Sequence, residues 1–108
     1  ANDTFGGDTP EETLELFIQA LENDDIELAS KYFVVEKQIG MKEKLIESIE
    51  SGGAKMLLDF YLYQNIRKSY YDYMNTYEYI FLDKDDGPGF RFELVLNTQT
   101  DKWKISEI

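Results

Sequence analysis

The chain changes its hydrophobic period once, near Ile66, and this change constrains the fold more than any other feature. Before that point apolar residues recur at helical spacing, as in Leu14, Phe17 and Leu21. After it they alternate with polar residues, which is typical of strands that bury one face. Helices followed by consecutive strands predict an α+β fold. We expect three to four N-terminal helices packed on a curved antiparallel sheet of three to four strands.

Capping residues mark the start of the first two helices. Thr9, Pro10 and Glu12 form a capping box, in which a hydroxyl, a proline and a carboxylate suit the first helical turn. The break at residues 23–25, Asn-Asp-Asp, predicts the cap of a second, shorter helix. The apolar residues expected on this helix are Ile26, Leu28, Ala29, Tyr32 and Phe33.

A third helix is predicted over residues 36–51 and ends at Gly52-Gly53. The sequence leaves open whether this helix breaks at Gly40, a weak helix former. A fourth helix is predicted over residues 54–63, although the aromatic end of this segment also suits a strand. The expected apolar positions of the third helix are Ile39, Leu45, Ile46 and Ile49, and those of the fourth are Met56, Leu57, Phe60 and Tyr61.

The strands are separated by turn-forming segments. Residues 83–89 and residues 97–101 are rich in Asp, Gly, Asn and Thr, as short antiparallel connections require. Apolar residues alternate on both sides of each turn, which predicts a meander with one face under the helices. These residues are Tyr77, Tyr79, Phe81, Phe90, Phe92, Leu94, Leu96, Trp103 and Ile105.

Length and charge narrow the possible partners. With 108 residues, the chain is predicted to form one domain over residues 9–108, preceded by a flexible tether over residues 1–8. Residues 1–50 carry 13 acidic and 4 basic residues, a net charge of −9, and the whole chain has a net charge of −11. This charge argues against nucleic acid and anionic lipid as partners. Since no apolar run reaches about 18 residues, no membrane insertion is expected.

The reactive side chains are few. The chain has no cysteine and no histidine, so thiolate nucleophiles, histidine bases and histidine or thiolate metal sites are excluded. A carboxylate in an apolar site remains as a possible general base, with Asp59, Asp72, Glu78 and Glu93 as the candidates. Strand alternation directs Glu78 and Glu93 toward solvent. The acidic turn at residues 83–87 departs from a calcium loop in its glycine position, so we expect no metal and no cofactor.

Eight tyrosines in 108 residues offer three interpretations. Tyrosine fills half-buried strands with its ring and keeps its hydroxyl near water, so a purely structural role is sufficient. A concave, tyrosine-lined cavity can also hold a flat or apolar ligand, and an exposed row of rings can bind a protein. Single-stranded nucleic acid would need a basic groove that Arg67, Lys68 and Arg91 do not supply.

The order of elements resembles the nuclear transport factor 2-like group of cystatin-like folds. The resemblance rests on Thr9-Pro10-Glu11-Glu12 with Phe17, on residues 29–33 and on the closing Asp101-Lys102-Trp103-Lys104-Ile105. The resemblance covers residues 9–108. Within this group, the chain is similar to small exported bacterial domains of unknown function. The resemblance implies an extracytoplasmic location, secreted or tethered to the membrane. It also implies a cone-shaped sheet, whose interior is either hollow or filled, and possible homodimerisation through the open sheet face.

Together these observations predict a non-catalytic binding module for a small apolar ligand or a protein partner. One alternative is an interaction or dimerisation domain with a filled cone. Another is a small cofactor-free lyase or isomerase that uses Asp and Tyr, as the ketosteroid isomerases of the resembled group do. The candidate residues lining the cone are Phe17, Tyr32, Tyr61, Tyr73, Tyr77, Tyr79, Phe92 and Trp103.

Overall fold

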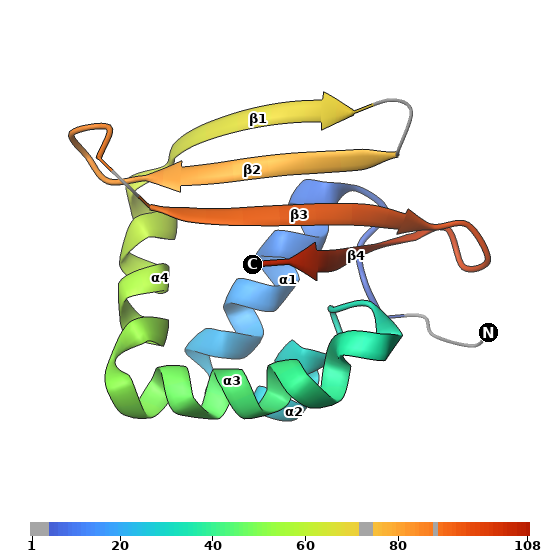
Figure 1. Ribbon diagram of the computed structural model, residues 1–108, viewed down its shortest axis with the longest axis horizontal. Coiled ribbons are helices and arrows are strands. Elements are labelled where there is room, and N and C mark those ends of the chain that lie inside the picture. Colours follow the sequence, from blue (N-terminus) through green and yellow to red (C-terminus); the bar gives the residue numbers. More distant parts are fainter. Residues whose placement is uncertain (1–4, 72–74, 88) are drawn as a thin grey trace.

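The computed structural model describes residues 5–71, 75–87 and 89–108 and confirms the predicted α+β class (Figure 1). Helices come first and a single antiparallel sheet follows. None of the described helices is long and apolar enough to cross a membrane. The elements in chain order are α1 (Pro10–Glu22), α2 (Ile26–Ser30), the 3₁₀ turn η1 (Val35–Lys37), α3 (Gln38–Ser51), α4 (Gly53–Tyr63), β1 (Asn65–Tyr71), β2 (Thr76–Leu82), β3 (Phe90–Asn97) and β4 (Lys102–Glu107).

The helix starts follow the predicted caps. The Thr9 hydroxyl accepts a hydrogen bond from the Glu12 N–H (3.1 Å), and the Asp25 carboxylate accepts one from the Leu28 N–H (3.1 Å). These bonds satisfy backbone donors that the first helical turn leaves without partners. The second helix is shorter than expected and ends at Ser30.

The third helix runs through Gly40 without a break and ends at Gly52, whose φ of +87° is the left-handed conformation that favours glycine. The fourth segment is helical over Gly53–Tyr63, which decides between the helix and strand interpretations of this segment. Its buried residues are Ala54 and Leu57, whereas Met56, expected on the apolar face, is 55% exposed.

The expected apolar face of α3 is wrong at three of its four positions. Leu45 is buried, but Ile39, Ile46 and Ile49 are 82%, 43% and 39% exposed. Met41, four residues before Leu45 and therefore on the same helical face, is the other residue that α3 buries. Because the rest of the molecule covers only that face of α3, the isoleucines remain in solvent.

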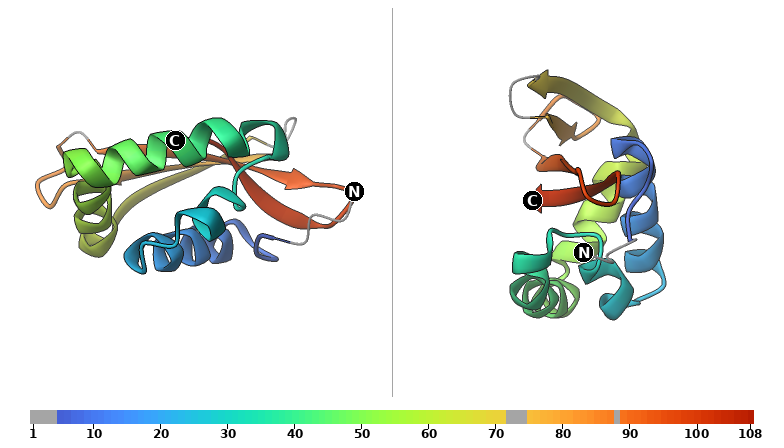
Figure 2. Two further views of the ribbon diagram at one scale, coloured as in Figure 1. Left: turned by 90° about the horizontal axis from the view of Figure 1, so that it is seen from below. Right: turned by 90° about the vertical axis from the view of Figure 1, so that its right-hand side faces the viewer.

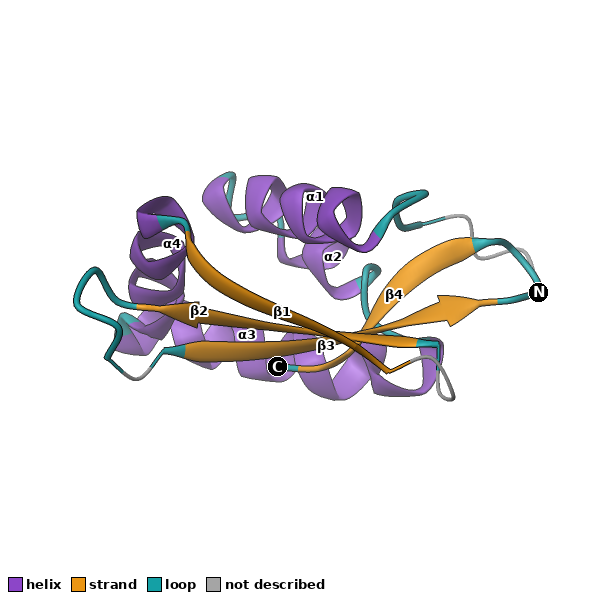
Figure 3. Cartoon of the chain, turned by 90° about the horizontal axis from the view of Figure 1, so that it is seen from above, coloured by secondary structure: helices purple, strands orange, loops and turns teal. Residues whose placement is uncertain are grey.

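The four strands follow one another in the order β1-β2-β3-β4, as a meander. The sheet curves, and α1 lies across its concave face (Figures 2 and 3). Tyr79 pairs with Phe92 and Leu94 pairs with Ile105, so the apolar residues of neighbouring strands share that face. In Figure 1, α3 lies beyond β4, and α4 connects α3 to β1.

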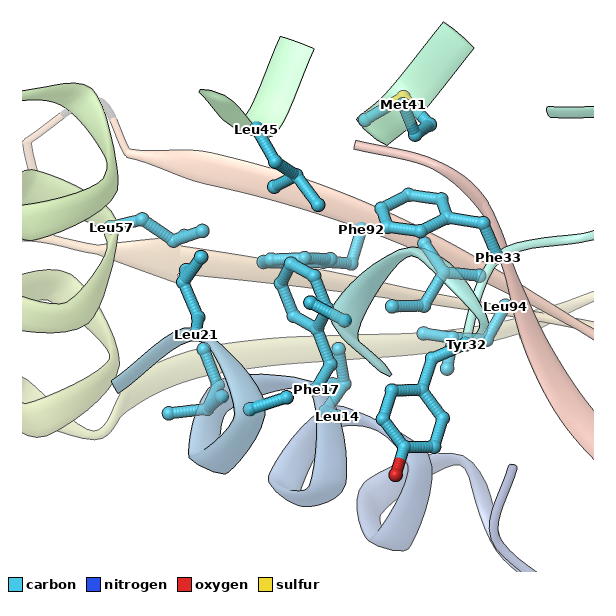
Figure 4. Close-up of a cluster of buried hydrophobic side chains, with 14 of the residues drawn as sticks. Leu14, Phe17, Leu21, Tyr32, Phe33, Met41, Leu45, Leu57, Phe92 and Leu94 are labelled. Carbon is cyan, nitrogen blue, oxygen red and sulfur yellow. The ribbon is translucent and has the colours of Figure 1, made fainter. Parts of the chain in front are cut away.

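Aromatic rings join α1 to the sheet. Phe17, which is fully buried, packs edge to face against Phe33 (5.5 Å between ring centroids) and against Phe92 (6.1 Å). Phe92 also contacts Phe81, at 5.4 Å. Figure 4 shows the rings of Phe17, Phe33 and Phe92 together with Leu14, Leu21 and Leu94.

The strand β4 is held on its free edge by two other segments. The Tyr32 carbonyl oxygen accepts from the Ile105 N–H (2.8 Å), and the Val34 N–H donates to the Ile105 carbonyl oxygen (2.9 Å). Tyr32 and Phe33 were predicted to be helical, but pairing with β4 takes them out of α2. Gly7 also pairs with Trp103, so part of the predicted tether contacts the sheet, while residues 1–4 lie outside the described residues.

We predict that Phe17→Ala lowers the free energy of unfolding by about 3–5 kcal/mol, because the cavity left behind lies between α1 and the sheet. Urea denaturation of the full chain measures this change. The control is Leu62→Ala, at a position that is 72% exposed, and its expected change is within about 0.5 kcal/mol. Similar losses in both variants would contradict the packing described for Phe17.

Thr13 provides a second test, because its buried hydroxyl links three segments. It accepts from the Gly7 N–H (2.9 Å) and donates to the Trp103 carbonyl oxygen (3.0 Å). We predict that Thr13→Val lowers the free energy of unfolding by about 1–3 kcal/mol, the cost of leaving buried polar groups unpaired. Hydrogen exchange at the Trp103 amide, which donates to the Gly7 carbonyl oxygen, should become faster. Unchanged exchange there would show that Gly7 stays in place without the hydroxyl.

Candidate functional site

Side chains fill the centre of the concave face, which the sequence analysis left open as either hollow or filled. Phe17 and Phe92 are fully buried and Phe81 is 1% exposed. Their rings contact one another rather than an open space. Of the predicted lining residues, these two phenylalanines therefore belong to the hydrophobic core.

The other predicted lining residues lie around this core. Tyr32 and Tyr79 are 6% and 3% exposed, and Tyr61, Tyr77 and Trp103 are half-buried at its border. Tyr73 lies outside the described residues. Tyr61, Tyr77 and Tyr79 lie at the β1–β2 side of the concave face, and Trp103 of β4 contacts the Tyr77 ring. Tyr32 lies near Phe5 instead, with 6.4 Å between the two ring centroids.

A polar cluster closes the concave face between α1 and the first two strands. Glu11, in the first turn of α1, accepts a hydrogen bond from the Tyr79 hydroxyl (2.7 Å) and one from the Lys68 ammonium (2.9 Å). Both bonds reach the same carboxylate oxygen, Oε1. Lys68 and Tyr79 are opposite each other across β1 and β2, so the strand register places both donors together.

The cluster shifts the proton affinities of its members. The hydrogen bond from Lys68, followed by that from Tyr79, holds the pKa of the Glu11 carboxyl below its usual range. Burial, followed by the hydrogen bond to the Glu11 carboxylate, raises the pKa of Tyr79 well above its usual value. Near neutral pH the arrangement therefore keeps Glu11 ionised and Tyr79 protonated.

A small hollow of about 170 Å³ adjoins this cluster. Burial, and then the charges of Glu15 and Glu22, raise the pKa of Tyr61, which lies on its border. The lining residues come from α1, from the end of α4 and from β1 and β2. They are Glu11, Leu14, Glu15, Tyr61, Gln64, Ile66, Tyr79 and Phe81.

An aromatic row continues from the cluster across the sheet. The Tyr77 ring lies 4.5 Å from Tyr70, 5.3 Å from Trp103 and 6.1 Å from Tyr79, measured between ring centroids. The Lys68 ammonium lies about 6 Å from the rings of Tyr77 and Tyr79. Tyr70, at the β1 end of this row, is 45% exposed, so part of the row faces solvent.

A more apolar pocket lies at the corner between α3 and α4, away from the tyrosines. Its volume is about 230 Å³. Leu21 of α1, Leu45 of α3, Leu57 of α4 and Phe90 of β3 border it, so four elements contribute to its wall. The remaining lining residues are Met41, Lys44, Ser48, Gly53, Ala54 and Ile108. In Figure 4, Leu21, Leu45 and Leu57 point toward the space between these helices.

A wider and more polar groove of about 410 Å³ shares Met41, Lys44 and Ile108 with this pocket. Lys37 crosses one side of the groove and donates to Glu107 (2.8 Å). Lys44 forms no ion pair among the residues that the structure describes. The pocket therefore has an apolar interior and at least one available cation at its border.

None of the predicted lining residues that the structure describes borders this pocket, so sequence reasoning missed it. The helix-breaking pair Gly52-Gly53 was a usable signal, because it places two amphipathic helices at an angle to each other. Small residues beside that angle, Gly53 and Ala54, leave the space between them partly empty. The apolar face expected for α3 did not include Met41, and it was therefore placed on a different side of the helix from the face that borders the pocket.

The three candidate carboxylates that the structure describes are placed unfavourably for base chemistry. Glu78 and Glu93 lie on the convex face, opposite the aromatic residues, as strand alternation predicted. Their side chains are 16% and 23% exposed, because both pair with Arg91. Asp59 is exposed on α4, and Asp72 lies outside the described residues.

The acidic turn uses its carboxylates internally. Asp83 accepts hydrogen bonds from the N–H groups of Asp85 (2.8 Å) and Gly87 (2.7 Å), which is the geometry of an aspartate-stabilised turn. Within the part of the chain that the structure describes, no group of three or more acidic residues is arranged to hold a metal ion.

Comparison with known proteins adds no relative: no family model, no curated protein and no solved structure matches this chain. The resemblance to nuclear transport factor 2-like domains therefore stays a prediction. The function is therefore inferred from the geometry of the chain itself.

We predict that the stability difference between the wild type and Glu11→Gln depends on pH. Because the pKa of Glu11 is lowered in the folded chain, its ionised form stabilises that state above about pH 4.5. This contribution is lost as the pH falls through the lowered value. Urea denaturation at about pH 6 and about pH 3 should show the larger difference at pH 6. Glu15→Gln, on the same helix and without an ion pair in the described structure, is the control, and a pH-independent difference for Glu11→Gln would contradict the cluster.

Proposed function

We propose that this chain is a non-catalytic binding module that takes a small apolar ligand in the α3–α4 pocket. The observation that carries the proposal is the lining of this pocket. Leu21, Met41, Leu45, Leu57 and Phe90 surround it from four elements that are distant in sequence. Burying apolar ligand surface against such side chains is favourable, at about 25 cal/mol per Å².

The size of the pocket limits the ligand. Drug-sized molecules occupy sites of about 300–1,000 Å³, and an apolar cavity of about 150 Å³ takes up benzene. A volume of about 230 Å³ therefore suits a ligand of one ring or a short alkyl chain. The shared border with the polar groove leaves room for a polar end beside Lys44.

The chemistry of the lining supports binding rather than catalysis. The ten lining residues include Lys44 and Ser48 but no carboxylate and no tyrosine. A general base works best when its pKa lies near the operating pH. Glu11, a carboxylate that lies beside Tyr79, has its pKa moved in the opposite direction, below its usual range. An extracytoplasmic location remains a prediction that rests on the resemblance alone.

The aromatic row supports a second candidate, a protein partner bound on the concave face. Tyr70 is 45% exposed, and Tyr77 and Trp103 are half-buried beside it. Rings with one covered and one solvent-facing side are frequent in protein interfaces. Light scattering over a range of concentrations tests the homodimer form of this candidate, since a strictly monomeric chain would exclude it.

Titration of the isotope-labelled chain with toluene and with 1-hexanol, followed by amide chemical shifts, tests the pocket. We predict saturable shifts that are concentrated at residues 41–57. Ala54→Leu should abolish them, because Ala54 is 7% exposed and its added methyl groups would occupy the pocket. We expect Ala54→Leu to lower the affinity for both probes by more than about tenfold, which corresponds to a loss of at least about 1.4 kcal/mol of binding free energy.

Lys55→Leu is the matched control, since it adds an apolar side chain to the same helix outside the pocket lining. It should bind both probes as the wild type does. Thermal unfolding of both variants shows whether they remain folded. Shifts that are dispersed over the chain, or that persist in Ala54→Leu, would exclude this pocket as the site.

A further inference from the structure

The outer face of α3 carries the isoleucines that the core leaves uncovered. Ile39, Ile46 and Ile49 are 82%, 43% and 39% exposed, and Val35, in the turn before the helix, is 60% exposed. In Figure 1, α3 runs along the lower border of the molecule, with α2 beside it. A row of exposed β-branched residues on one helix is unusual for a surface and indicates an interface.

The spacing of these residues is that of a helix-pairing seam. Ile39 and Ile46 are seven residues apart, and Ile49 follows three residues later, as at the a and d positions of a heptad. The remaining d position is Lys42. Its ammonium group forms an ion pair with Glu27 of α2 (2.6 Å), so α2 borders the seam at this position.

Acidic residues accompany the seam on one side. Glu43 and Glu50 each follow an a or d residue by one position, which places them at successive e positions of the same heptad. Glu36 precedes Glu43 by seven residues and continues this row, and Glu47 lies beside it. All four are exposed, and none of them forms an ion pair among the described residues.

Uncompensated charge at e positions decides which helix can pair with a seam. A second copy of this chain would bring its own glutamates and a net charge of −11 to the interface, so electrostatic repulsion opposes pairing of α3 with itself. A helix with Lys or Arg beside its apolar stripe meets opposite charge instead. Charge complementarity therefore favours a basic partner over a second copy.

We propose that the outer face of α3 is a docking site for a basic amphipathic helix of a partner protein. The partner helix inserts apolar residues between Ile39, Ile46 and Ile49, and its basic residues pair with Glu43 and Glu50. The 14 residues of α3 span about 21 Å, so the partner contributes about two heptads of contact. This site is separate from the apolar pocket, which uses the inner face of the same helix.

A pair of designed peptides tests the proposal on the full chain. The first is a helix of about three heptads with Leu at a and d and Lys at e and g, and the second has Glu at e and g. Repulsion between like charges keeps both peptides from pairing with themselves. Isothermal titration calorimetry should show that the Lys peptide binds, that the Glu peptide does not, and that salt weakens binding.

Charge-reversal variants separate a local site from general attraction to an acidic protein. Glu43→Lys with Glu50→Lys should weaken binding of the Lys peptide by about tenfold or more and allow the Glu peptide to bind. The control is Glu22→Lys with Asp59→Lys, which makes the same change in net charge at exposed positions away from α3. It should leave the affinity for the Lys peptide within about twofold.

Apolar variants test the seam itself. Ile39→Asn with Ile46→Asn should reduce binding of the Lys peptide by more than about tenfold, whereas Leu62→Asn, at an exposed position of α4, should not. All these positions are exposed, so the fold is retained, which circular dichroism checks. The proposal is overturned if the Lys peptide does not bind, if both charge-reversal pairs weaken it equally, or if the asparagine variants bind as the wild type does.

Discussion

The contact of Phe17 with Phe92 is the interaction on which the rest of the structure depends. It joins α1, at the start of the fold, to the third strand of a sheet that begins only at Asn65. Phe33 packs on the same ring of Phe17 and fixes the segment that pairs with β4. Burying three rings in one place offsets the entropy of closing such long loops. It also fills the space that a ligand would otherwise occupy.

Because the centre is filled, the apolar pocket lies at the border of the helical layer. The inner face of α3 meets α4 at an angle set by Gly52 and leaves an apolar pocket between them. The outer face of α3 exposes a seam of isoleucines beside unpaired glutamates. One helix therefore carries two surfaces of different chemistry.

The polar cluster of Glu11, Lys68 and Tyr79 links the helical layer to the sheet. A lysine and a tyrosine both donate to one carboxylate oxygen, which favours the ionised acid. The cluster ties the first turn of α1 to β1 and β2, a contact that no spacing in the sequence indicated, since Glu11 is 57 and 68 residues away from its two donors.

The sequence by itself determined the α+β class, the caps at Thr9 and Asp25, the glycine that ends α3 and the alternation of the strands, because these depend on neighbouring residues. Only the tertiary structure decided which face of α3 is buried, because Met41 with Leu45 and Ile39 with Ile46 form equally periodic stripes. Tertiary structure also decided that the phenylalanines fill the concave face and that the pocket lies at the α3–α4 corner. The position of an empty space depends on how distant elements are oriented, and no local pattern records that orientation.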